Sequence, residues 1–164
     1  MNHATKQVRI GDRVAEIDIG IAELVKQIWI ANIDTTNSCE ENEPGIAWLQ
    51  FPASWDAIEF LNIVGGDYCD DIKSLYNRIR REWQVGDDTT GEWNYEVDPW
   101  DISVDQREVG GEIEEKSEGD RDFLLAVSMR FPTSDIPELV RRLEKFNERR
   151  EEGSHSERAC HLEE

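Results

Sequence analysis

The chain has 164 residues, of which 38% are hydrophobic, and this is enough for one compact domain with a single core. Acidic residues outnumber basic residues 37 to 18, and the formal net charge of -19 argues against direct binding to nucleic acids or to an anionic membrane. Three cysteines without zinc-ligand spacing argue against a disulfide framework, and no apolar run reaches membrane-spanning length. The composition therefore predicts a protein of the cytoplasm with no membrane partner.

The N-terminal part predicts a β-hairpin followed by a helix. Two short strands, at 8–10 and 13–17, flank Gly11-Asp12, and a glycine at the first turn position suits a type II′ turn. Asp18 is a candidate N-cap for the helix that follows. The apolar residues of this helix recur at helical spacing as Ile21, Ala22, Val25, Ile28 and Trp29.

The remaining elements follow from strict alternation in strands and from helical spacing in helices. Ser54 is a candidate N-cap, and Asp135 with Glu138 forms a D-x-x-E capping pattern. We expect an extended segment at 33–38, a loop at 39–45, a strand at 46–51, a helix from 54 to 64, a helix from about 70, a strand at 92–98, an acidic insertion at 99–121, a long strand at 123–131, a helix from 135 to about 148 and a polar flexible tail at 149–164.

A near-repeat organises these elements. Residues 47–54 read Ala-Trp-Leu-Gln-Phe-Pro-Ala-Ser, and residues 127–134 read Val-Ser-Met-Arg-Phe-Pro-Thr-Ser. The order helix, strand, strand, helix occurs in residues 18–64 and again in 70–148. This order predicts one α+β domain over residues 1–148, a two-layer sandwich with helices on one face of an antiparallel sheet and an αββα duplication. Coincidence remains an alternative, because Phe-Pro followed by a Ser or Thr cap is a common junction.

The negative charge is concentrated in residues 87–122, which hold fourteen acids against Arg107, Lys116 and Arg121. One interpretation is a solvated, partly disordered insertion that self-repulsion keeps soluble. The other interpretation is an acidic docking surface for a partner.

The candidate site lies on the face of the sheet that is turned away from the helices. If Leu49 and Phe51 face the helices, Trp48 and Gln50 face outward beside Arg130, and this outer face is too apolar to stay wet. A second copy of the chain, a ligand groove or the N-terminal hairpin are the alternatives for covering it. Ligand binding by Thr36, Ser38, Cys39, Trp48, Gln50 and Arg130 is the proposed use, with Trp48 as a stacking platform and Arg130 as an anion partner.

Catalysis is the weaker interpretation of these residues. Nucleophilic chemistry at Cys39 needs a nearby base, yet His3, His155 and His161 all lie in terminal segments. Alternatively, Thr36 and Ser38 bind the loop backbone while Cys39 packs as a small apolar group. No metal ligand set and no phosphate or dinucleotide motif is found, so neither a metal nor a cofactor is expected.

Two segments carry a resemblance to a known group of proteins. Residues 24–29 through Thr36-x-Ser38-Cys39-Glu40, together with 127–132, resemble a family of small uncharacterised bacterial and bacteriophage proteins with a Thr-x-x-Ser-Cys-Glu/Gln segment and a C-terminal Arg-Phe-Pro strand end. The resemblance implies no activity. It favours a phage or mobile-element protein that antagonises a host defence function by binding.

The sequence thus predicts a non-enzymatic binding protein, expected as a homo-oligomer, that occupies a host protein or sequesters a small polar or nucleotide-like ligand. An acidic nucleic-acid mimic that inhibits a DNA-binding enzyme is the alternative. A small hydrolase that depends on Cys39 is the third hypothesis.

Overall fold

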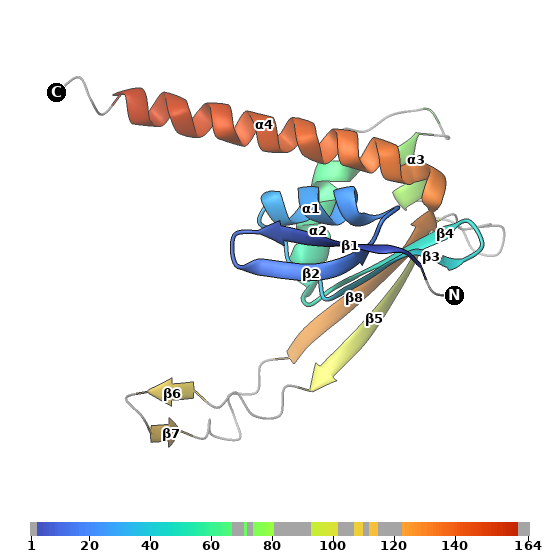
Figure 1. The fold of residues 1–164 in the computed structure, drawn as a ribbon, viewed down its shortest axis with the longest axis horizontal. Helices are drawn as coiled ribbons and strands as arrows, with labels where there is room; N and C mark the ends of the chain where they lie inside the picture. Colours follow the sequence, from blue (N-terminus) through green and yellow to red (C-terminus); the bar gives the residue numbers. More distant parts are fainter. Residues whose placement is uncertain are drawn as a thin grey trace.

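A computed structural model of the chain describes residues 3–66, 71, 74–80, 93–101, 107–109, 112–114 and 123–160. The elements confirm the predicted α+β class (Figure 1). In chain order they are β1 (Thr5–Ile10), β2 (Arg13–Asp18), α1 (Ala22–Ile30), β3 (Asn37–Glu43), β4 (Ile46–Phe51), α2 (Ser54–Gly65), α3 (Leu75–Arg80), β5 (Asn94–Asp101), β6 (Arg107–Val109), β7 (Glu112–Glu114), β8 (Phe123–Pro132), the short 3-10 helix Thr133–Asp135 and α4 (Ile136–Cys160).

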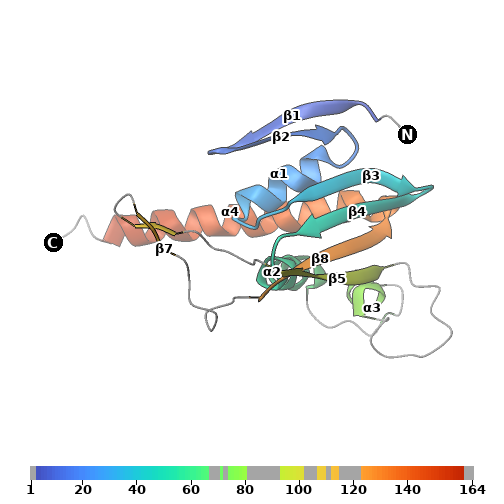
Figure 2. The same cartoon turned by 90° about the horizontal axis from the view of Figure 1, so that it is seen from below.

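The N-terminal hairpin has the predicted turn. Gly11 has a φ of 57°, and Asp12 is not among the described residues with positive φ, which is the type II′ pattern. Strands β1 and β2 form a two-stranded sheet of their own beside α1 rather than extending the edge of the main sheet (Figure 2). Asp18 ties the hairpin to β3, because its Oδ2 accepts a hydrogen bond of 3.1 Å from the Glu40 backbone N–H.

The main sheet has the strand order β3-β4-β8-β5, and every neighbouring pair is antiparallel. The two near-repeat segments lie side by side at its centre, as β4 and β8. Their register places Leu49 opposite Met129 and Ala47 opposite Phe131. A twofold axis between the halves would require this register. Each residue pair is then either formed by two residues that are equivalent in the near-repeat, as for Leu49 and Met129, or is related by the axis to another pair. The register is the one that two αββα halves related by a twofold axis would have.

All the described helices lie on one face of the main sheet, as predicted (Figures 1 and 2). Alternation along β4 sends Ala47, Leu49 and Phe51 into this layer, where each is fully buried. The ring of Trp93 stacks on Phe131 with 4.8 Å between centroids, which joins β5 to β8 in the same core. The helices, with the residue that precedes α1, contribute further fully buried side chains, namely Ile21 before α1, then Leu24, Ile28, Phe60, Leu139 and Leu143.

Two segment boundaries differ from the prediction. The segment 39–45 is not a loop, because β3 continues through Glu43 and only Pro44 and Gly45 connect it to β4. Strand β5 does not stop at Pro99 but continues to Asp101. Both β3 and β5 are edge strands, and an edge tolerates acidic side chains and a proline that cannot donate to a ladder.

Two of the predicted N-caps, Asp18 and Ser54, are wrong. Helices α1 and α2 begin without a side-chain capping bond, and Ser54 is already inside α2. Asp18 bonds to the Glu40 backbone, and Asp135 forms an ion pair with Arg78. Asp135 has a stronger partner than a helix backbone offers, because the charge of Arg78 strengthens the hydrogen bonds between them.

The C-terminal helix is longer than predicted. Helix α4 continues to Cys160 and projects past the rest of the fold (Figure 1), whereas a polar tail was expected from residue 149. Arg and Glu, which make up half of residues 149–160, are good helix formers. Residues 161–164 of the predicted tail lie outside the described residues. None of the described helices combines the length and the apolar character that crossing a membrane requires.

The acidic insertion 99–121 lies only partly within the described residues. Its first residues continue β5, and a short antiparallel hairpin, β6 with β7, follows. In the register of β5 and β8, the pairs from Asp98–Ala126 to Asp101–Phe123 extend beyond the last residue of β4. This two-stranded extension, called the ribbon below, leads from the main sheet into the insertion.

Candidate functional site

The outer face of the main sheet carries a row of side chains across all four strands. Trp48 of β4 lies opposite Cys39 of β3 and, on its other side, opposite Arg130 of β8. Arg130 in turn lies opposite Asn94 of β5. Residues opposite one another share a face of the sheet, and Trp48 alternates with the fully buried Ala47 and Leu49. The row therefore points away from the helices.

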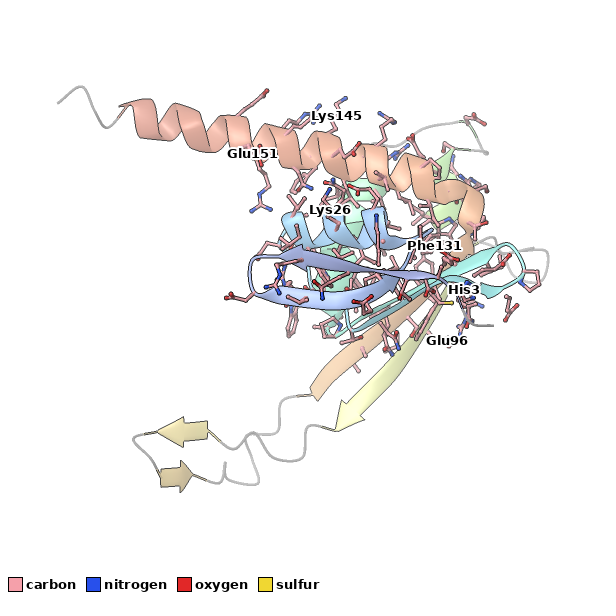
Figure 3. The ribbon with its side chains drawn as sticks, in the orientation of Figure 1. His3, Lys26, Glu96, Phe131, Lys145 and Glu151 are labelled. Carbon is pink, nitrogen blue, oxygen red and sulfur yellow. The ribbon has the colours of Figure 1, made fainter. Side chains whose placement is uncertain are left out.

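A second row lies beside the first. Gln50 of β4 lies between Asn37 and Ser128, and Ser128 lies opposite Glu96. Thr36 joins this row from the start of β3, because its hydroxyl lies 3.1 Å from Oε1 of Gln50 and its N–H donates to the Gln50 carbonyl. Figure 3 shows Glu96 on the side of the sheet away from Lys26 and Lys145, which α1 and α4 carry.

The structure brings together most of the residues that the sequence singled out. Cys39, Trp48, Gln50 and Arg130 share the outer face, and Thr36 contacts Gln50 at its edge. Ser38 does not join them. It lies opposite Leu49 and so points to the helix side of the sheet.

The outer face combines a paired charge with an unsatisfied donor. Nη1 of Arg130 lies 2.8 Å from Oε2 of Glu96, so the cation is held in place by a neighbour on the next strand. Nε1 of Trp48 is buried and has no hydrogen-bond partner among the described residues. An unsatisfied buried N–H costs about 1–3 kcal/mol, which a ligand acceptor would recover.

Asn94 and Glu96 were missed as site residues. Both lie on the polar side of the predicted strand 92–98, so alternation gave the signal. What the sequence did not provide was the neighbour relation between this strand and β8, which determines that Glu96 meets Arg130.

The surroundings of Cys39 disfavour a thiolate. Burial, above all, and the carboxylates of Asp18 and Glu40 raise the pKa of its thiol. The N-terminal His3 is nearer to this segment than its position in the sequence suggested, because its Nδ1 lies 2.9 Å from Oε1 of Glu40. That carboxylate also accepts a short hydrogen bond from the Gly20 N–H, and these two partners hold the pKa of Glu40 below its usual range.

Metal binding finds no support in the part of the chain that the structure describes. No group of three or more His, Cys, Asp and Glu side chains there could hold an ion. Of the histidines considered from the sequence, His161 lies outside the described residues.

Comparison with known proteins identifies one relative. An uncharacterized protein of Acanthamoeba polyphaga mimivirus is 31% identical over 140 residues, which is 82% of this chain. The match spans 64% of the viral protein, so this chain corresponds to less than two thirds of that relative's length. No family model and no solved structure matches the chain.

Proposed function

We propose that this protein is a non-enzymatic binding protein that holds a small polar, nucleotide-like ligand on the outer face of its main sheet. The observation that carries the proposal is the buried, unpartnered Nε1 of Trp48, which lies in the same row as Arg130 and Cys39. The indole offers a donor and a ring on which a planar group stacks. Arg130, held by Glu96, offers a fixed cation for an anionic group.

The electrostatics of Cys39 support binding rather than covalent catalysis. A cysteine nucleophile needs a lowered pKa, and both burial and carboxylate neighbours act in the opposite direction here. The thiol is therefore better suited to line the ligand site as a small, weakly polar group.

Native mass spectrometry of the protein purified without denaturation tests the proposal. We expect a co-purifying mass that is lost from the Trp48→Phe variant, which keeps a ring but removes the N–H. Trp55→Phe on α2 is the matched control and should keep that mass. Adenosine monophosphate, added to protein that carries no ligand, should bind at least fivefold more weakly to Trp48→Phe than to Trp55→Phe. Equal binding by both variants would contradict the proposal.

A homo-oligomer that covers the outer face is the second use of this surface. Its apolar member, Trp48, and its polar rim resemble the composition of interfaces. Light scattering separates the two uses, because a dimer through this face should dissociate in Arg130→Glu, whereas a ligand site on a monomer leaves the mass unchanged.

The biological role that we propose is antagonism of a host function by a phage or mobile-element protein in the host cytoplasm. The similarity to a viral protein supports a viral setting. The concentration of acids in residues 87–122 favours an acidic nucleic-acid mimic as the alternative mechanism. Deletion of residues 102–120 would abolish inhibition of a DNA-binding enzyme by a mimic, but would leave ligand binding at Trp48 intact.

A further inference from the structure

Four of the six exposed large apolar side chains in the described part of the chain belong to helix α2 and to the paired strands β5 and β8. Trp55 and Ile58 lie on α2 with 61% and 57% of their surfaces exposed, and Val97 of β5 is 56% exposed. Leu125 of β8 is the fourth. We call these four residues the α2–ribbon patch, since Leu125 lies in the ribbon and Val97 directly precedes it. Helix α2 packs against β8, and large apolar side chains that stay exposed on adjacent elements mark interaction surfaces.

The register shows that the members of the patch face the same side. Val97 lies directly opposite Val127, which packs against the core on the helix side of the sheet. Leu125 is two residues from Val127 and so points to the same side. Helix α2 packs against β8 on that side, and its Trp55 and Ile58, three residues apart, lie on its outward surface. The patch is therefore on the opposite side of the sheet from Trp48.

The surroundings of the patch are acidic. Helix α2 contains Asp56 and Glu59 but no Lys or Arg. Asp34 lies against its first turn, where its N–H donates to Oδ1 of Asp56 over 3.1 Å. Burial is the main cause that raises the pKa of Asp56, and the charges of Asp34 and Glu59 act in the same direction, whereas the Asp34 N–H and the charge of Arg13, which pairs with Asp34, act against it. The ribbon leads into residues 87–122, with fourteen acids and three bases.

We propose that the α2–ribbon patch docks a basic amphipathic segment of a partner protein. Apolar side chains of that segment cover Trp55, Ile58 and Leu125, while its Lys and Arg residues meet the acids around α2. Tryptophan is a frequent energetic centre of interfaces, and charge complementarity selects the partner and speeds association. A second copy of this chain fits less well, because a symmetric dimer would bring the same acids, and two net charges of -19, together.

A matched pair of charge insertions tests the proposal. Ile58→Glu places a charge in the patch. Ile19→Glu places the same charge outside the patch, between β2 and α1, where Ile19 is similarly exposed at 54%. The probe is a fluorescein-labelled synthetic amphipathic helix of Leu and Lys, with a peptide of the same composition in scrambled order. By anisotropy in 150 mM salt, we expect the ordered peptide to bind the wild type and Ile19→Glu equally, and Ile58→Glu at least tenfold more weakly.

Further outcomes decide against the proposal. It is overturned if neither peptide binds, if the scrambled peptide binds as well as the ordered one, or if Ile19→Glu weakens binding as much as Ile58→Glu. It is also overturned if light scattering shows a wild-type dimer that Ile58→Glu dissociates, because the occupant is then a second copy.

Trp55→Ser serves as the second patch variant if circular dichroism shows that Ile58→Glu does not fold. Trp48→Phe should leave peptide binding unchanged, since ligand binding on the outer face is independent.

Discussion

Leu49 and Met129, which hold equivalent positions in the two halves of the chain, lie directly opposite each other in the central strand pair. Both are fully buried beneath the helices. Both belong to the single core, so the seam that joins β4 to β8 is part of that core. The two halves therefore cannot fold as separate domains without exposing this seam.

Shortening either side chain at this seam should destabilise the whole protein. We expect Leu49→Ala and Met129→Ala each to lower the free energy of unfolding by about 3 kcal/mol, through lost apolar burial and the cavity left behind. Urea unfolding measures this change. Val14→Ala, at an exposed site on β2, should change it by less than about 0.5 kcal/mol.

The double variant tests the contact between the two halves. Because the two residues are opposite each other, the effects of Leu49→Ala and Met129→Ala should differ from additivity by at least about 0.5 kcal/mol. Additive effects would mean that the two side chains belong to independent parts of the core.

The central strands could be predicted because one of their faces is buried. Alternation along 46–51 and 123–131 identified the inward residues, and Leu49, Phe51, Met129 and Phe131 are all fully buried. Helix α1 was predictable for the same reason, since its apolar stripe follows the helical period. A periodic pattern of apolar residues indicates which side of an element is buried, and each of these elements has one buried side.

The edge strands and helix starts could not be predicted because other forces determine them. Strand β3 is rich in acids and lacks an apolar face, so only pairing with β4 defines it. Asp135 fitted a local capping pattern, but its partner Arg78 is 57 residues away in the sequence. Among the candidate site residues, the prediction for Ser38 was wrong, because the register of β3 places this residue on the helix side of the sheet.

Removing the charge of Asp135 should destabilise the protein strongly. Its carboxylate is buried, receives two hydrogen bonds from Arg78 of 2.6 and 2.7 Å, and accepts a third from Nε1 of Trp93. Asp135→Asn leaves the guanidinium without its counter-charge, so we expect a loss of about 3 kcal/mol in thermal or urea unfolding. The exposed ion pair of Lys26 and Glu23 serves as the control for the buried pair of Asp135 and Arg78.

Lys26→Gln should cost less than about 0.5 kcal/mol, because solvent screens an exposed ion pair three residues apart on a helix. A similar loss in Lys26→Gln and Asp135→Asn would show that burial does not strengthen the Asp135 network.

Stability should fall in acid partly through Glu138. Hydrogen bonds from Arg141, and also from Arg142, lower the pKa of this carboxylate to about 2, from 4.5. A lowered pKa means that the stabilisation is fully present above pH 4.5 and is lost as the pH falls through 2. Glu138→Gln should therefore cost about 1 kcal/mol at pH 7, since the partly exposed site is screened, and almost nothing near pH 2.

Urea unfolding of wild type and Glu138→Gln at several pH values measures this convergence. Glu144→Gln, on an exposed position of the same helix, is the control and should follow the wild type throughout. If the difference between Glu138→Gln and wild type stays constant from pH 7 to pH 2, the ion pairs with Arg141 and Arg142 do not stabilise α4.

The reactivity of Cys39 separates ligand binding from cysteine catalysis. Burial and Asp18 raise the pKa of the thiol, so a smaller thiolate fraction is present at neutral pH than in free glutathione. In a Cys69→Ser, Cys160→Ser background, alkylation of Cys39 by iodoacetamide should be several-fold slower than that of glutathione, with its midpoint at a higher pH. Asp18→Asn should shift that midpoint downward, because it removes a negative charge beside the sulfur. A midpoint below that of glutathione would instead indicate a stabilised thiolate, and would favour the hydrolase over the binding protein.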